Sequence, residues 1–90
     1  MIEPGIVSAM ISALMGVGQR ASLTFENGIL DTSIVIGKDG MLFLKMIGGE
    51  YILVVVTVKD AAIPKVMEVI DEFAKELKGI LKEESRVVTL

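Results

Sequence analysis

An eight-residue run in the middle of the chain, Tyr51 to Val58, is apolar on both of the faces that it would present as a β-strand. Alternate side chains of a strand point to opposite sides of the sheet. A sheet with one wet face would therefore carry polar residues at every second position. The two alternating sets here are Ile52, Val54 and Val56, and Leu53, Val55 and Thr57. The run predicts a sheet that must be covered on both faces.

The flanking patterns predict the rest of one α+β domain that spans residues 1–90. Two further runs have strand periodicity, and Gly37 to Gly40, with its Asp-Gly pair, is typical of a hairpin turn. Apolar residues at helical spacing predict one helix before the strands and one after them. The expected elements are a helix over about 4–20, strands over about 30–36, 41–46 and 51–58, a helix over about 61–82 and a tail over 83–90. Their order, α-β-β-β-α, describes a three-stranded antiparallel meander with a helix at each end.

Several local predictions accompany this order. Asp60 is a candidate N-cap of the last helix, with Pro64 in its first turn. Leu23 and Phe25 are expected to anchor the first connection to the core. The strand-like end Val87 to Leu90 is expected to pair with the open edge of the third strand.

The first helix contains no charged residue between Pro4 and Gln19. Ile6, Met10, Ile11, Leu14 and Val17 recur in it at helical spacing. Ser8, Ser12 and Gly16 form a second stripe of small residues, four positions apart, which lets another helix approach closely. The alternative is that these small residues are core positions beneath the sheet.

The apolar content exceeds what so short a chain hides by itself. Hydrophobic residues make up 52% of 90 residues and the mean hydropathy is +0.67, whereas a domain of this size buries only about 60–65% of its unfolded surface. The surplus predicts an interface with another subunit. A membrane span is the competing explanation, but the uncharged run is shorter than the roughly 20 apolar residues that a span needs. No basic segment precedes it, as a signal peptide requires. We therefore expect a cytoplasmic protein without membrane insertion.

The composition excludes several chemistries. The chain has no Cys and no His, which removes thiolate and imidazole zinc sites, disulfides and His-dependent triads. A net charge of −3 argues against a nucleic-acid partner. The carboxylates in turns and at strand ends, Asp31, Asp39, Glu50 and Asp60, are not paired with a plausible nucleophile. We expect no catalytic residue, cofactor or metal, and hence no enzyme.

The element order resembles the C-terminal part of a Roadblock domain, a longin-like fold found in the dynein light-chain Roadblock, the bacterial MglB proteins and small Ragulator subunits. The resemblance spans most of the chain. Its motifs are Asp31–Ile36, Gly37–Leu44, Tyr51–Val56 and Ala61–Leu81. The chain departs from the family in having no residues for the helix and strand hairpin that open it.

The resemblance implies a homodimer in which the first helices pair antiparallel and the first strands join into one sheet. The sequence leaves open whether the assembly is a dimer or a tetramer. The implied interface consists of Ser8, Ala9, Ser12, Ala13, Gly16, Ile34, Val35 and Ile36. It also implies a non-enzymatic module that binds and regulates or scaffolds a Ras-like small GTPase, through a surface that includes Met15, Gln19 and Arg20. The alternative is a small ligand-binding or enzymatic domain with a pocket between helix and sheet.

Overall fold

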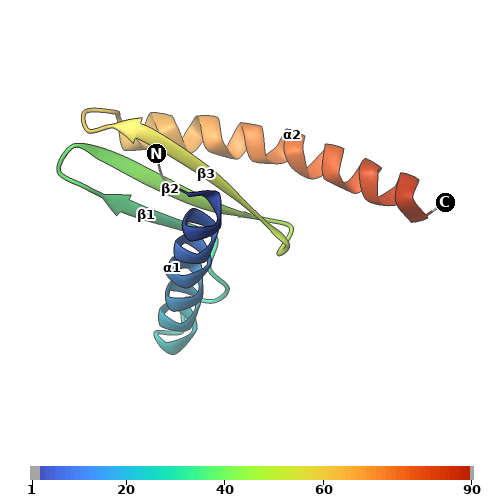
Figure 1. The fold of residues 1–90 in the computed structure, drawn as a ribbon, viewed down its shortest axis with the longest axis horizontal. Coiled ribbons are helices and arrows are strands. Elements are labelled where there is room, and N and C mark those ends of the chain that lie inside the picture. The colour runs from blue at the N-terminus through green and yellow to red at the C-terminus, as the bar shows by residue number, and fades with distance from the viewer. Residues whose placement is uncertain (1–2, 90) are drawn as a thin grey trace.

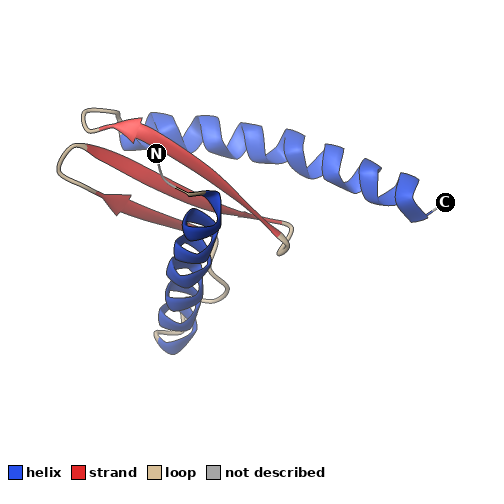
Figure 2. Ribbon diagram, in the orientation of Figure 1, coloured by secondary structure: helices blue, strands red, loops and turns tan. Residues whose placement is uncertain are grey.

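A computed structural model describes the backbone of residues 3–89 and the side chains of residues 3–81. Its elements are α1 (Pro4–Thr24), β1 (Thr32–Ile36), β2 (Gly40–Ile47), β3 (Tyr51–Val58) and α2 (Ile63–Thr89). The strands form one antiparallel sheet in the order β1-β2-β3 (Figure 1, Figure 2). The predicted α-β-β-β-α fold is confirmed.

Two tight turns set the register of the sheet. Ile36 pairs with Met41 across the first turn, where the amide of Gly37 donates to the carbonyl of Gly40 at 2.8 Å. Ile47 pairs with Tyr51 across the second, where Gly48 and Gly49 have φ of 63° and 80°. Only glycine adopts such angles without strain, so the glycine pair fixes where the second hairpin turns.

The helix α2 covers one face of the sheet. Met41 and Phe43 of β2 point to this face and pack with Ile70 of α2. Leu53 and Val55 of β3 pack against the same cluster, and Phe43 is completely buried. The C-terminal part of α2 extends beyond the sheet (Figure 1).

The opposite face is covered only in part. Leu44 follows Phe43 and therefore points to this opposite face. Leu44 is completely buried, and Met15 on α1 is almost completely buried. Figure 1 shows α1 crossing the sheet at a steep angle, with its C-terminal half extending past β1. Val56 and Val58, on the same face as Leu44, are 77% and 71% exposed. Within one chain, this face of the sheet lacks a complete cover.

The chain is less compact than a self-contained domain of its length. Its radius of gyration is 14.5 Å, against about 12 Å for a compact 90-residue domain. Its accessible surface is 6991 Å², which exceeds by about 1,900 Å² the roughly 5,100 Å² expected for a monomer of this mass. The protruding ends of α1 and α2 raise both the radius of gyration and the accessible surface.

The predicted ends of several elements need correction. α1 continues to Thr24 and β1 begins at Thr32. α2 begins at Ile63, which leaves Asp60 in the preceding turn and not at the N-cap. Pro64 lies in the first turn of α2, as predicted.

The predicted tail over 83–90 is also wrong, because α2 continues to Thr89. The segment after Leu81 contains no Gly or Pro to stop a helix, and its Lys and Glu residues favour one. Val87 to Thr89 therefore do not pair with β3 as a strand, and Leu90 lies outside the described residues.

The end of α1 is a Schellman turn with an unusual residue at its centre. The amide of Asn27 donates to the carbonyl of Ser22 at 2.7 Å, and that of Glu26 to Leu23 at 3.1 Å. This motif places one residue in the left-handed region, usually glycine, and here it is Glu26 with φ of 59°. The turn leaves Phe25 75% exposed and Leu23 exposed. They do not anchor the connection, because both belong to the end of a helix that has already passed the sheet.

Replacing the strained residue is expected to stabilise the fold. Glu26→Gly should raise the free energy of unfolding by about 0.5–1 kcal/mol, because glycine adopts a positive φ without the Cβ clash. Gly28→Ala is expected to have the opposite effect, because Gly28 has φ of 83°. An added Cβ would meet no atom there, so the loss of stability would come from backbone strain alone. Urea unfolding measures both. Equal effects of the two substitutions would contradict this account of the turn.

Candidate interaction surface

One stripe of α1 faces the sheet. Val7 and Ile11 are half-buried and Met15 is buried. The Oε1 atom of Gln19 accepts a hydrogen bond of 2.6 Å from the amide of Leu30. A Cβ on Gly18 would lie 3.0 Å from the Leu30 side chain, so the absence of a side chain allows this close approach. The helix is thus fixed to the start of β1.

The remaining surface of α1 is apolar and exposed to solvent. Ile6, Met10, Leu14 and Val17 are 41–70% exposed, and no charge occurs from Pro4 to Gln19. A helix without a polar face has no side suited to water. This helix therefore presents an apolar surface that a single chain leaves uncovered.

The small residues of α1 are exposed, and two of them border the space between α1 and the sheet. The five predicted interface positions on this helix, Ser8, Ala9, Ser12, Ala13 and Gly16, are all exposed. Ser12 and Gly16 line a groove of about 280 Å³ between α1 and the sheet. A Cβ on Gly16 would meet no atom within 4 Å. The small side chains leave space that the chain itself does not fill.

The outer edge of β1 adjoins this helix. In the described part of the chain β1 pairs only with β2, and Ile34, Val35 and Ile36 are exposed. We call the exposed face of α1 together with this edge the α1–β1 surface. All eight predicted interface residues are exposed. By register, Ile34 and Ile36 share the α2 face of the sheet with Phe43 and Met41, and only Val35 shares the face on which α1 lies.

The predicted partner surface needs correction. Met15 is only 5% exposed because it lies on the side of α1 that faces the sheet. The Gln19 side chain accepts a hydrogen bond from the Leu30 amide. Arg20 alone of the three is exposed. In a helix that is apolar all round, the sequence does not reveal which positions turn toward the sheet.

By length and composition, Pro4–Thr24 is a helix that could cross a membrane. At 1.5 Å per residue it is about 31 Å long, close to the thickness of the hydrocarbon layer. A spanning helix must be surrounded by lipid or other spans, however, whereas Met15 is buried and Gly18 and Gln19 contact Leu30, just before β1. Spanning would require this packing to be broken.

A charged clamp joins β1, β2 and α2 on the other face. Lys45 is the single charged residue of β2, and its Nζ lies 2.6 Å from Asp31 and 3.5 Å from Asp71. The hydrogen bond from Lys45, followed by that from Thr32, lowers the pKa of Asp31. The hydrogen bond to Asp31 raises the pKa of Lys45. This clamp was not predicted from the sequence, although one lysine within an apolar strand was its signal.

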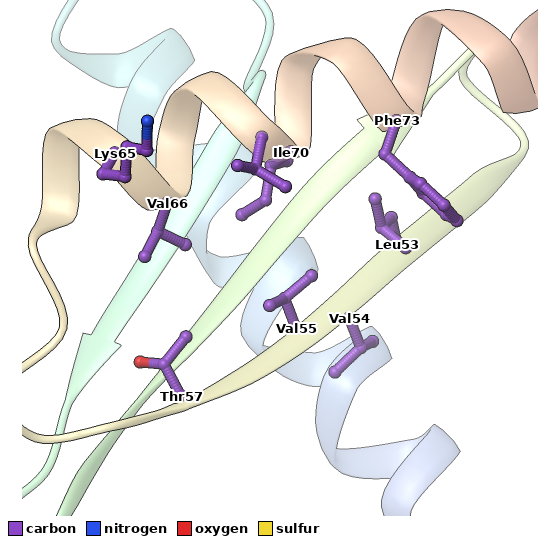
Figure 3. A pocket seen from close by; sticks show the side chains of 9 residues that line it. Leu53, Val54, Val55, Thr57, Lys65, Val66, Ile70 and Phe73 are labelled. Atoms are coloured by element: carbon purple, nitrogen blue, oxygen red, sulfur yellow. The ribbon is translucent and has the colours of Figure 1, made fainter.

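An apolar groove of about 520 Å³ lies between α2 and β3 (Figure 3). Leu53, Val55 and Thr57 form its floor. Its α2 wall consists of Lys65, Val66, Val69, Ile70 and Phe73. The Thr57 hydroxyl donates to the carbonyl of Val58 at 3.2 Å, and the Lys65 ammonium points away from the groove (Figure 3). Small-molecule sites combine an apolar lining with a few convergent polar groups, and this groove has the lining alone.

Among the side chains that the structure describes, no group of three or more carboxylates is placed to hold a metal ion. No protein-family model and no curated protein matches this sequence. The function therefore has to be argued from the surfaces of the fold.

Removing the carboxylate of the clamp is expected to lower stability near neutral pH. Asp31→Asn should reduce the free energy of unfolding by about 0.5–1 kcal/mol, the range for a largely exposed ion pair. Because the pKa of Asp31 is lowered, its contribution is complete above the ordinary value of about 3.9 and is lost as the pH falls through the lowered one. Because the pKa of Lys45 is raised, the pair also weakens as the pH rises through that value, above about 10.4.

Urea unfolding of wild type and Asp31→Asn across this range tests the clamp. The two curves should converge in strong acid and separate near neutrality. Asp39→Asn, an exposed aspartate in the first hairpin turn, is the matched control and should leave stability within a few tenths of a kcal/mol. A difference for Asp31→Asn that persists in strong acid would show that its cause is not the ion pair.

Proposed function

We propose that this chain is a Roadblock-like, non-enzymatic module of the cytoplasm that forms a homodimer and binds a Ras-like small GTPase. The observation that carries the proposal is the α1–β1 surface. A helix without charge from Pro4 to Gln19 exposes its apolar side chains, and the outer edge of β1 is unpaired in the described part of the chain. Monomeric proteins rarely leave such a surface in water.

The proposed dimer uses a two-fold axis beside β1. Two α1 helices pack antiparallel, with Ala9 and Ala13 allowing close contact, and two β1 edges exchange backbone hydrogen bonds. A standard interface buries about 800 Å² per partner. The surface excess of this chain, about 1,900 Å² relative to a monomer of its mass, is large enough to supply it.

The GTPase is proposed to bind the outer side of the paired α1 helices. This role follows from the resemblance to Roadblock domains, whose members commonly act as platforms for these GTPases. Arg20 is exposed at the end of the uncharged segment, where it provides a charged contact at the edge of an apolar one. The alternative, a ligand-binding domain, is supported by the groove beside β3, but the lack of convergent polar groups there favours an interaction module.

A charge inserted into the α1–β1 surface is expected to prevent the dimer. Ala13→Arg should halve the mass of the particle, or reduce it further, in light scattering at a fixed concentration, because an unpaired cation would be buried in the helix pair. Ala62→Arg is the matched control, since Ala62 is also an exposed alanine but lies outside this surface. An unchanged mass for Ala13→Arg would contradict the proposed dimer.

Reversing the charge of Arg20 is expected to weaken GTPase binding without affecting the dimer. Immobilised wild type should retain a Ras-like GTPase from native lysate, identified by mass spectrometry, and Arg20→Glu should lower its affinity by roughly tenfold, within the range for a charged interface pair. Lys38→Glu, in the exposed hairpin turn, is the control. Failure to recover any GTPase, or equal recovery by all three proteins, would contradict this partner.

A further inference from the structure

The edge strand β3 lacks the features that usually prevent strand edges from pairing. In the described part of the chain it pairs only with β2, so its other edge presents free backbone groups. Its eight residues contain no charge and no proline. Natural edge strands are normally interrupted by lysine, proline or a bulge, or are covered. This edge is therefore suited to accept another strand.

The groove along this edge adds side chains to the same surface. Leu53, Val55 and Thr57 of β3 form its floor, and Val69 and Phe73 of α2 border it. Val69 and Phe73 are 56% and 50% exposed. A strand added to β3 would place every second side chain in this groove.

One interface at the α1–β1 surface leaves the β3 edge uncovered. The α1–β1 surface and the β3 edge lie at opposite ends of the strand order. A single two-fold axis cannot cover both, so the β3 edge requires its own partner.

The charges around this edge are arranged so that opposite signs come together when two copies of the edge lie antiparallel. Glu50 immediately precedes β3 and Lys59 immediately follows it, so an antiparallel second copy brings each beside the other. On α2, Lys65 and Glu76 flank Val69 and Phe73 at helical spacing. An antiparallel copy of α2 would bring Lys65 toward Glu76 in the same way.

Side-chain direction and charge select the register. Residues that pair must lie on the same face, so the two-fold axis passes through a residue, and Val54 and Val55 are the two residues at the middle of β3. An axis at Val55 would set Glu50 opposite Asp60 of the second copy, and like charges directly opposite are destabilising. An axis at Val54 sets Val54 opposite itself and Glu50 opposite Val58, so that no two like charges are directly opposite.

We propose that β3 pairs antiparallel with β3 of a second copy of this chain, about a two-fold axis at Val54. The pairing continues the sheet, joins the two grooves and places Val69 and Phe73 of both copies at their centre. It is independent of the α1–β1 dimer. If both interfaces form, they occupy opposite edges of one sheet, so assembly does not stop at two chains.

A single cysteine tests the axis directly, because the chain contains none. At a two-fold axis, residues directly opposite have Cα atoms about 4.5–5.5 Å apart, within the range that a disulfide bridges. Val54→Cys should therefore convert most of the protein to a covalent dimer under a mild oxidant. Val58→Cys is the matched control on the same face and strand, where the two thiols would be about 27 Å apart at 3.4 Å per residue.

Opposite charges provide the second test. Val54→Lys and Val54→Glu should each abolish this interface, and an equimolar mixture should restore it as a one-to-one pair. In an Ala13→Arg background the single variants should be particles of 9.7 kDa and the mixture twice that mass. With α1 unchanged, Val54→Lys should keep the α1–β1 dimer, which separates failure of one interface from failure of the other.

Three results would overturn the proposal. Cross-linking at Val54→Cys no faster than at Val58→Cys would show that the edge does not meet itself there. Equal masses for wild type, Val54→Lys and Val54→Glu would show that the edge is free or binds a different molecule. A mixture of the two charge variants that fails to associate would exclude the two-fold axis.

Discussion

The central strand β2 holds this protein together. It is the one strand of the described sheet with a neighbour on both sides, and its successive residues Phe43 and Leu44 are the completely buried side chains of the two opposite faces. Phe43 packs under α2, and Leu44 lies on the face that α1 crosses. Truncating a buried Phe typically destabilises a protein by about 3–5 kcal/mol, comparable with the whole stability of a small domain. The other elements are positioned by their contact with this strand.

Around β2 the chain exposes apolar surface at both edges of the sheet. At one edge, β1 has free backbone groups and α1 is uncharged from Pro4 to Gln19. At the other, the uncharged strand β3 borders an apolar groove under α2. Inside the sheet, Lys45 forms a clamp with Asp31 and Asp71. Both edges therefore carry uncovered apolar surface, which is the basis of the two proposed interfaces, and the Lys45 clamp ties β1, β2 and α2 together.

The order of elements could be predicted because each has a strong periodic pattern or a turn signal. On α2, charged residues leave one apolar stripe, and Ile70 and Ala74 of that stripe are buried. The face of α1 could not be predicted in the same way. Its apolar residues surround the helix, so nothing in the sequence distinguishes Met15, which is buried, from Leu14 or Val17, which are exposed. The same lack of contrast led to Met15 and Gln19 being assigned to a partner surface. The end of α2 was misjudged because Val87 to Thr89 have strand-forming side chains but follow a helix without a stop signal.

The sequence by itself determined the strand register and the sheet's need for two covers, because alternation and glycine turns are properties of neighbouring residues. It also determined that catalysis by Cys or His is impossible. Only the tertiary structure decided how much of that cover one chain supplies. The angle at which α1 crosses the sheet, the close approach at Gly18 and the reach of Lys45 to two carboxylates depend on residues distant in sequence. Whether an apolar side chain is buried in the core or exposed depends on how the rest of the chain packs around it. The described residues leave both edges of the sheet unpaired.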